Sequence, residues 1–207
     1  MTHFDRKAHW EKIYTTKELT EVSWYQPKPL TSLNFIQSFN LSLDASIIDV
    51  GGGDSLLVDE LLNLGFTNIT VLDISSAAIE RAKKRLGEKA ALVKWIVTDI
   101  ANFKTTEKFD CWHDRAAFHF LTSTTDINQY IQTVSSAVKA NGFLIVGTFS
   151  EDGPTKCSGI EIKQYSAENL EKKFSSHFKK ISCEMINHAT PFNTVQSFCF
   201  CKFQKKI

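Results

Sequence analysis

Three consecutive glycines, Gly51 to Gly53, follow an apolar segment that carries Asp49, and a helical pattern begins directly after them. This order of residue types predicts a strand, a tight turn and the start of a helix. Glycine allows the backbone of such a turn to come close to a ligand, and a helix N-terminus directs backbone N–H groups at that ligand. The turn is therefore the first candidate for a binding site.

Two classes of ligand compete for this turn. A dinucleotide turn requires Gly-x-Gly-x-x-Gly or Ala, but Leu56 holds the last position and would crowd the contact between helix and strand. The pattern acid-x-Gly-x-Gly-x-Gly fits better, with the small residue Ser55 in its last place. Asp49 would repel a pyrophosphate and suits an ammonium group, such as that of S-adenosylmethionine. A purely structural turn, capped by Asp54 or Ser55, is the third interpretation.

Two further acids end the next two predicted strands. Asp73 follows the glycines by about 20 residues, the spacing at which a carboxylate can bind ribose hydroxyls, although it could also cap the following helix. Asp99 ends the third strand and could accept a hydrogen bond from an adenine amino group, with Ile100 stacking nearby. Because parallel strands end at the same edge of a sheet, these acids and Asp49 together predict a nucleoside site.

Alternating strand and helix patterns must position these residues. The predicted strands cover residues 46–50, 68–73, 92–98, 108–113 and 143–149, and the predicted helices cover residues 4–18, 30–40, 55–65, 75–86, 123–139 and 166–176. Gly65 and Gly87 would end two helices, and Asn141-Gly142 would turn the chain into the fifth strand. The pattern predicts a doubly wound α/β fold. Residues 179–187 and 196–204 predict a C-terminal antiparallel hairpin, which makes a mostly parallel seven-stranded sheet.

Composition limits the partners that we expect. The 207 residues suffice for one domain, with an N-terminal helical or lid segment over 1–45 and the ligand-binding part over 46–207. A net charge of +1 predicts no nucleic-acid partner and no membrane surface. Residues 1–7 lack the apolar run of a secretory signal, so we expect a cytoplasmic protein, a monomer or weak dimer, with its five cysteines reduced.

From about residue 46 to the C-terminus, the chain resembles the class I S-adenosylmethionine-dependent methyltransferases. The motifs that carry the resemblance are Asp49–Ser55, Val71–Ser75, Thr98–Ile100, Phe109–Arg115 and Val138–Phe143. The resemblance implies a Rossmann-like fold, S-adenosyl-L-methionine as the cofactor, and transfer of its methyl group. No metal is expected, because no pair of Cys and His residues has the spacing of a zinc site.

The resemblance also implies a role for each position. Gly51 and Gly53 would let the methionine end of the cofactor approach the backbone, and Asp49 would hold its ammonium group. The residues that it implies for cofactor binding are Tyr14, Trp24, Asp49, Gly51, Gly53, Ser55, Asp73, Ile74, Asp99 and Ile100. The aromatic residues among them belong to an N-terminal cover. Tyr14 could reach the cofactor carboxylate and Trp24 or Tyr25 could line the substrate pocket, or these rings could simply fix the first helix to the core.

Residues that choose the methyl acceptor are expected at the end of the fourth strand, over 112–120. This segment lacks the Asn-Pro-Pro-Tyr or Asp-Pro-Pro-Tyr that holds planar amino groups in related enzymes, which argues against nucleic-acid amines and glutamine. Asp114-Arg115, followed by small residues, resembles the thiopurine-type thiol methyltransferases and, less closely, the Asp-Lys-Gly stretch of some protein-lysine methyltransferases.

Three residues of this segment are candidates for catalysis. Arg115 is a fixed cation that could favour a thiolate or another anion, or it could simply pair with Asp114. His113 or His119 could accept a proton near neutral pH. His119 lies in an apolar run and is also compatible with a buried core position, and Cys157 is a free thiol in a later glycine-containing loop.

We therefore predict a methyltransferase that acts on a small molecule, with a thiol or related sulfur as the acceptor. A protein-lysine methyltransferase and a catalytically inactive module that only binds the cofactor are the alternatives. A dehydrogenase that uses NAD is the third, and Asp49 and Leu56 disfavour it.

Overall fold

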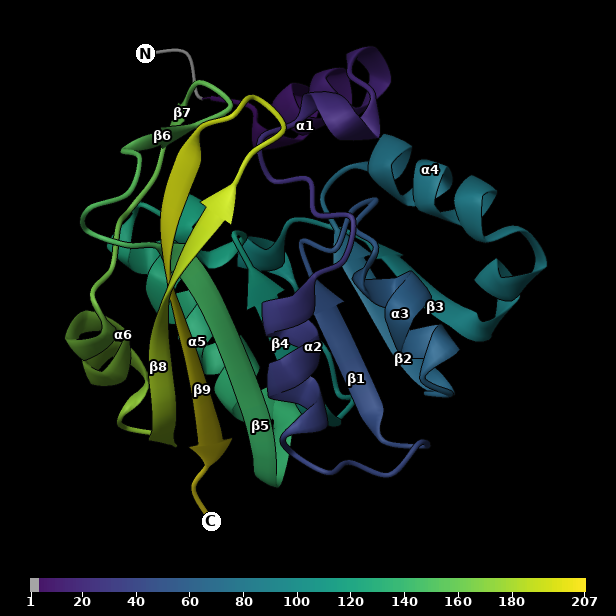
Figure 1. The fold of residues 1–207 in the computed structure, drawn as a ribbon. Coiled ribbons are helices and arrows are strands. Elements are labelled where there is room, and N and C mark those ends of the chain that lie inside the picture. Colours follow the sequence, from purple (N-terminus) through teal and green to yellow (C-terminus); the bar gives the residue numbers. More distant parts are fainter. Residues whose placement is uncertain (1–3) are drawn as a thin grey trace.

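A seven-stranded sheet forms the centre of the computed structural model, which describes residues 4–207 (Figure 1). Its strands are β1 Ser46–Val50, β2 Asn68–Asp73, β3 Val93–Val97, β4 Phe109–Arg115, β5 Val138–Phe149, β8 Phe178–Ala189 and β9 Val195–Lys205. The order is β3-β2-β1-β4-β5-β9-β8, in which β1 to β5 are parallel and β9 is antiparallel to both neighbours. The predicted fold, including its C-terminal hairpin, is confirmed. Residues 1–3 lie outside the described residues. They belong to the segment 1–7, in which we expect no secretory signal.

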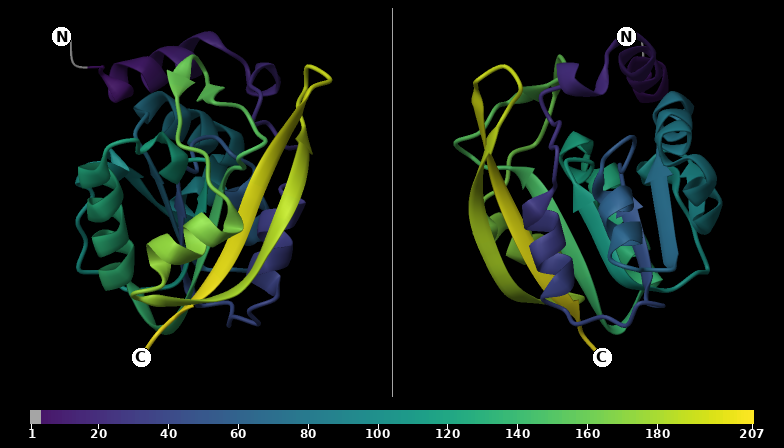
Figure 2. Two further views of the ribbon diagram at one scale, coloured as in Figure 1. Left: turned by 90° about the vertical axis from the view of Figure 1, so that its left-hand side faces the viewer. Right: turned by 45° about the vertical axis from the view of Figure 1, so that its right-hand side comes forward.

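Helices cover both faces of this sheet (Figure 2). The α-helices are α1 Arg6–Thr16, α2 Leu30–Gln37, α3 Leu57–Asn63, α4 Ser76–Leu86, α5 Thr124–Ala137 and α6 Ala167–Phe174. Residues of α2, α3 and α4 pack on one face, and those of α5 and α6 pack on the other. Helix α1 lies across the carboxyl ends of the strands, next to α4. Over residues 4–207, no helix is long and apolar enough to cross a bilayer.

Strand β1 shows why the sheet is parallel and fully covered. All five of its residues are buried, and Ile47 packs in one hydrophobic cluster while Ile48 packs in the other. A strand that is buried on both faces needs a continuous apolar run, and side chains that alternate between the faces divide it between two cores. The polar side chain of Asp49 therefore lies near the carboxyl end of β1, where the strand reaches the edge of the sheet.

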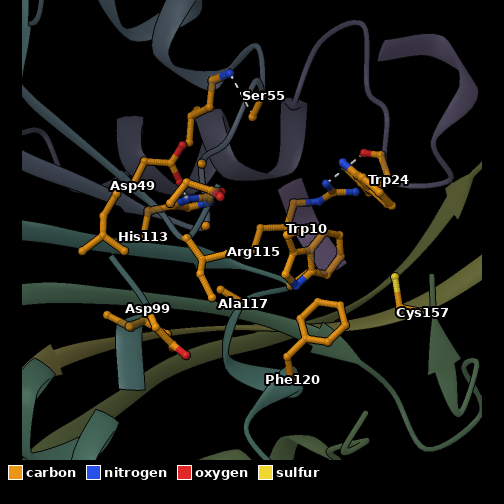
Figure 3. A pocket seen from close by; sticks show the side chains of 18 of the residues that line it. Trp10, Trp24, Asp49, Ser55, Asp99, His113, Arg115, Ala117, Phe120 and Cys157 are labelled. Atoms are coloured by element: carbon orange, nitrogen blue, oxygen red, sulfur yellow. Dashed lines mark hydrogen bonds and ion pairs between the residues drawn. The ribbon is translucent and has the colours of Figure 1, made fainter. Parts of the chain in front are cut away.

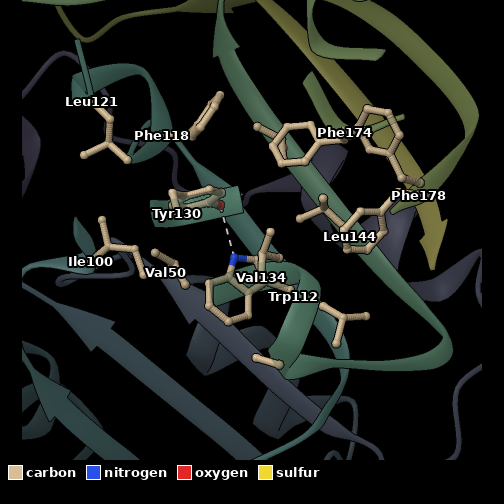
Figure 4. Close-up of a cluster of buried hydrophobic side chains, with 14 of the residues drawn as sticks. Val50, Ile100, Trp112, Phe118, Leu121, Tyr130, Val134, Leu144, Phe174 and Phe178 are labelled. Carbon is tan, nitrogen blue, oxygen red and sulfur yellow. Dashed lines mark hydrogen bonds between the residues drawn. The ribbon is translucent and has the colours of Figure 1, made fainter. Parts of the chain in front are cut away.

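The cluster beneath α5 also positions the end of β4 (Figure 4). The indole N–H of Trp112 donates to Tyr130 Oη at 3.1 Å, and this hydroxyl donates to Asp114 Oδ2 at 2.7 Å. The other oxygen of Asp114 accepts the backbone N–H groups of Ala117 and Phe118. Both carboxylate oxygens of Asp114 thus accept hydrogen bonds that hold the turn after β4.

The predicted turn at Asn141-Gly142 is a bulge inside a longer strand. Strand β5 begins at Val138, which pairs with Phe109, whereas Phe143 pairs with Cys111. The extra residues on β5 therefore leave the ladder, and Asn141 adopts a left-handed φ of 64°. Hydrophobic periodicity does not show whether such residues interrupt a strand or bulge from it.

The expectation that all five cysteines are reduced is wrong for two of them. Cys183 and Cys201 are opposite each other on β8 and β9 and form a disulfide. Cys199 remains free, as do Cys111 and Cys157, and its sulfur lies 3.8 Å from that of Cys201. Cys199 and Cys201 lie two residues apart on β9, so their side chains share one face of the strand. The pairing of Cys183 depended on the register of the hairpin, which the sequence does not reveal.

Candidate active site

A cavity of about 1020 Å³, part of it open to solvent, lies at the carboxyl ends of β1 to β4, beneath α1 (Figure 3). The predicted cofactor residues that line it are Tyr14, Trp24, Asp49, Gly51, Ser55, Asp73, Ile74, Asp99 and Ile100. Gly53 is not in the lining, but lies directly between the side chains of Tyr14 and Asp73. Tertiary structure thus brings residues from five separate segments of the sequence to one site.

The glycine turn is shaped as a cradle. Gly51 and Gly53 have φ angles of 68° and 48°, which side chains with a Cβ rarely adopt. A Cβ at Gly51 would lie 2.7 Å from Ala117 Cβ, and a Cβ at Gly53 would lie 2.9 Å from Tyr14 Oη. The turn therefore requires glycine here, and it leaves bare backbone facing the cavity, as binding of the cofactor's methionine end would need.

Asp73 combines the two roles considered from the sequence. Its Oδ1 accepts the backbone N–H of Ser75 at 2.8 Å, at the N-cap of α4. The carboxyl group is buried at the edge of the cavity, and burial, together with the charges of Asp54 and Asp49, raises its pKa to about 7 despite the backbone donors. Further hydrogen-bond donors would stabilise the ionised form of this carboxyl group, and ribose hydroxyls would supply them.

Asp99 is held by the N-terminal helix. Its Oδ1 accepts the N–H of Ala101 at 2.9 Å, while its Oδ2 lies 3.2 Å from Nη2 of Arg6. The same Arg6 nitrogen lies 3.1 Å from Asp126 at the start of α5. Sequence analysis missed Arg6, because no local pattern relates it to an acid more than 90 positions away.

Helix α1 is fastened over the cavity by Glu11. The Glu11 carboxylate accepts hydrogen bonds from Ser75 Oγ, from the N–H and Oγ of Ser76, and from the N–H of Ala77. Burial alone would raise the pKa of Glu11, but these hydrogen bonds from Ser76, Ala77 and Ser75 lower it to about 2. An ionised side chain of α1 therefore satisfies the free N–H groups at the start of α4.

The aromatic residues of the N-terminal segment form one wall of the cavity (Figure 3). The ring of Trp10 packs edge-on against Phe120 and Trp24, with centroids 5.0 and 5.7 Å apart, and Tyr14 packs against Trp24 at 6.2 Å. Tyr25 is not in the lining. The rings thus both fix α1 and face the cavity, so the two interpretations of this segment are compatible.

His113 lines the cavity, but both of its ring nitrogens are occupied. Nδ1 lies 2.7 Å from Asp49 Oδ1, and Nε2 lies 2.8 Å from Ser32 Oγ on α2. A base that takes a proton directly from a substrate needs a free nitrogen, which His113 lacks in this arrangement. Ser32 also lines the cavity, and no motif marks it as a site residue, since it lies in an ordinary amphipathic helix.

Arg115 has no carboxylate partner among residues 4–207, and Asp114 is used elsewhere. Its Nη1 donates to the carbonyl oxygen of Trp24 at 3.0 Å, and its guanidinium lies 5.2 Å from the ring centroid of Phe198. Its buried Nη2 has no hydrogen-bond partner within the described chain. Burial lowers the pKa of Arg115 to about 10, so the group stays charged at neutral pH.

His119 is not brought into the cavity. The side chain is completely buried, its Nδ1 accepts the backbone N–H of Phe149 at 3.2 Å, and its ring packs against Phe120. Burial, with the charge of Arg115, lowers the pKa of His119 to about 3, so the ring is neutral. The structure therefore offers no contact through which His119 could take a proton from a substrate.

Cys157 reaches the cavity from a small hairpin that the sequence did not predict. Strands β6 Lys156–Cys157 and β7 Ile160–Glu161 are joined by Ser158 and Gly159, both with positive φ. Burial raises the pKa of Cys157 to about 11, although Ser158 and Arg115 oppose this, so the thiol is not an activated nucleophile. In the part of the chain that the structure describes, no group of His, Cys, Asp or Glu is arranged to hold a metal.

Known proteins of similar sequence are methyltransferases. Residues 48–144 match the family described as a methyltransferase domain. Human EEF1A lysine methyltransferase 2 is 27% identical over 189 residues, covering 84% of this chain and 74% of the relative. Malonyl-[acyl-carrier protein] O-methyltransferase 2 of Ilyobacter polytropus is 28% identical over 164 residues, covering 74% of this chain and 62% of the relative, so the chain spans less than two thirds of that enzyme.

A solved structure shows the same fold. The N-methyltransferase NodS from Bradyrhizobium japonicum WM9, in complex with S-adenosyl-L-homocysteine, superposes with a TM-score of 0.71 over 97% of this chain and 99% of NodS, at 17% identity. Residues 48–144 thus carry a methyltransferase domain, and the chain is an S-adenosylmethionine-dependent methyltransferase. Its cofactor is S-adenosyl-L-methionine.

Proposed function

We propose that this methyltransferase acts on a small-molecule acceptor that is anionic or becomes so on losing a proton, with a thiol or related sulfur as the preferred nucleophile. The observation that carries the proposal is Arg115, a charged residue of the cavity lining whose buried Nη2 has no hydrogen-bond partner among residues 4–207. A buried cation without a counter-charge is costly, and an anion that enters the cavity relieves this cost.

The cofactor residues keep the roles that we predicted for them. Gly51 and Gly53 admit the methionine end, and Asp49 holds its ammonium group. Asp73 takes the ribose hydroxyls, and Asp99 takes the adenine amine. When bound, S-adenosylmethionine supplies an electrophilic methyl group on sulfur. Trp10, Trp24 and Phe120 of the chain exclude water from the acceptor end and orient the acceptor for in-line attack.

A protein-lysine acceptor is the second candidate, because the human relative that aligns with 84% of this chain is a lysine methyltransferase. The charge of Arg115 weighs against it. A lysine ammonium would approach the unpaired guanidinium of Arg115, and like charges at a partly buried site repel each other. A thiolate or carboxylate would be attracted to the same group. The resemblance of the fourth-strand motif to thiol methyltransferases supports the sulfur preference.

A transfer assay with cofactor labelled on the methyl group tests the proposal. The protein is incubated with separate pools of small thiols, carboxylates, phenols and amines, and in parallel with a protein lysate. We expect label in small products, most of all with thiols. Label confined to protein bands would refute the proposal and favour the lysine acceptor.

Variants of Arg115 test whether methyl transfer depends on its charge. R115M should reduce turnover at least tenfold, as expected when a charged hydrogen bond is lost, while binding of S-adenosylhomocysteine changes little. The matched control is K202M, because Lys202 also lies over an aromatic ring, that of Phe35, but is outside the cavity. Undiminished turnover in R115M would show that Arg115 is only structural.

A further inference from the structure

Three buried residues from distant parts of the chain form a continuous hydrogen-bonded row at the cavity. Ser32 of α2, His113 of β4 and Asp49 of β1 are 1%, 2% and 3% exposed. The row consists of Ser32 Oγ, 2.8 Å from His113 Nε2, and His113 Nδ1, 2.7 Å from Asp49 Oδ1. All three residues line the cavity, so the row ends at the ligand site and not in the protein interior.

The chemistry of the three groups gives the row a direction. An ionised carboxylate only accepts hydrogen bonds, so His113 Nδ1 must carry the proton that it shares with Asp49. Nε2 of a neutral ring is then an acceptor, and the hydroxyl of Ser32 is the group within reach that can donate to it. In this arrangement His113 donates to Asp49 and accepts from Ser32, so the row holds the Asp49 carboxylate in one orientation.

The second oxygen of Asp49 faces the glycine turn. A Cβ at Gly52 would lie 2.6 Å from Asp49 Oδ2, so this oxygen lies against the bare backbone where the methionine end is expected. Among the described residues, Oδ2 has no hydrogen-bond partner, whereas Oδ1 is bound to His113. The row fixes one oxygen of the carboxylate and leaves the other free for a cation.

We propose that Ser32 and His113 are positioning residues that hold the Asp49 carboxylate, ionised and correctly rotated, for the ammonium group of the cofactor. The inference rests on the assignment of Asp49 to that group in the proposed function. It does not depend on the identity of the methyl acceptor. The positioning role takes the place of the catalytic role that we predicted for His113. It also adds Ser32, which lies on α2 at the end of the row away from Asp49.

Calorimetric titration with two ligands tests this role without any acceptor. S-adenosylhomocysteine carries the amino acid part, and 5′-methylthioadenosine keeps the adenosine and the sulfur but lacks the amino acid. S32A should weaken binding of S-adenosylhomocysteine roughly fivefold, the loss expected for one net hydrogen bond. H113N should weaken it by at least as much. Neither change should alter binding of 5′-methylthioadenosine.

The double variant S32A/H113N distinguishes one coupled row from two separate effects. Because Ser32 acts through His113, the double variant should bind S-adenosylhomocysteine no more weakly than H113N alone. The matched control is S38A, at the C-cap of α2, where the hydroxyl donates to the carbonyl oxygen of Phe35, accepts from Lys202 and lies outside the cavity. S38A should leave both affinities unchanged.

Several results would overturn the inference. These are equal losses for both ligands, unchanged binding of S-adenosylhomocysteine in S32A, or losses that multiply in the double variant. Melting curves establish that each variant is folded, and if S32A does not fold, the H113N protein decides the matter with the same two ligands. A failed search for the acceptor would leave these measurements unaffected, so the two proposals fail separately.

Discussion

Asp73 gives the sharpest prediction, because its carboxyl group is buried at the site while its pKa lies near neutrality. Burial, with Asp54 and Asp49 nearby, raises this pKa to about 7 in the cofactor-free protein. Ribose hydroxyls that donate to the ionised carboxylate would lower it in the complex. Binding below pH 7 must therefore release a proton from Asp73, and affinity should fall as the pH falls.

The size of the effect follows from the pKa. At pH 6, one unit below a pKa of about 7, only about a tenth of the carboxyl groups are ionised, so affinity should be roughly tenfold lower than at pH 8. Titration calorimetry of S-adenosylhomocysteine in two buffers of different ionisation enthalpy counts the protons directly. We expect close to one proton released per complex at pH 6 and almost none at pH 8.

Two variants complete the experiment. D73N should bind weakly at every pH and should lose the proton release, because its amide does not titrate. D59N is the control, since Asp59 pairs with Arg85 outside the cavity and should change neither quantity. A flat affinity between pH 6 and 8, or proton release that persists in D73N, would refute the assignment of Asp73 to the ribose.

Three further predictions concern the stability of the molecule and its cover. The melting temperature of the cofactor-free protein should fall as the pH rises from 5 to 8. Burial raises the pKa of Asp73 to about 7 and that of Asp114 to about 6, so both carboxyl groups keep protons in the folded state that the unfolded chain has already lost. A melting temperature that rises over this range would contradict the prediction. E11A, measured by stopped-flow release, should speed dissociation of S-adenosylhomocysteine several-fold, because α1 loses its bonds to the start of α4; an unchanged rate would show that α1 does not cover the site. Reduction of the disulfide between Cys183 and Cys201 should lower the free energy of unfolding in denaturant by about 3 kcal/mol, and C183A should be insensitive to reductant.

Local chemistry was enough to predict the fold and the edge of the sheet where the cavity lies. The bounds of β1 and β2 agree with the apolar runs before Asp49 and Asp73, because a parallel strand buried on both faces must be continuously apolar. Gly51 and Gly53 were informative for a similar reason. A tight turn with positive φ constrains residue type within a few positions, whatever the rest of the chain does.

Contacts between distant segments were beyond such reasoning. Ser32 meets His113 across 81 positions, and the pairing of Cys183 with Cys201 depends on hairpin register. Neither periodicity nor turn chemistry contains this information, because it arises only when helices and strands pack in three dimensions.

The sequence by itself determined the class of fold, the glycine turn and the three acids that line the cavity, since each depends on residues that are neighbours along the chain. Only the tertiary structure decided what the residues after β4 do. It buried His119 away from the cavity, joined His113 to Asp49, and left Arg115 charged, with no carboxylate partner among residues 4–207 and with its Nη2 unbonded. These outcomes depend on which side chains surround each group, and burial and partners, not residue type, determine whether an ionisable side chain is structural or functional.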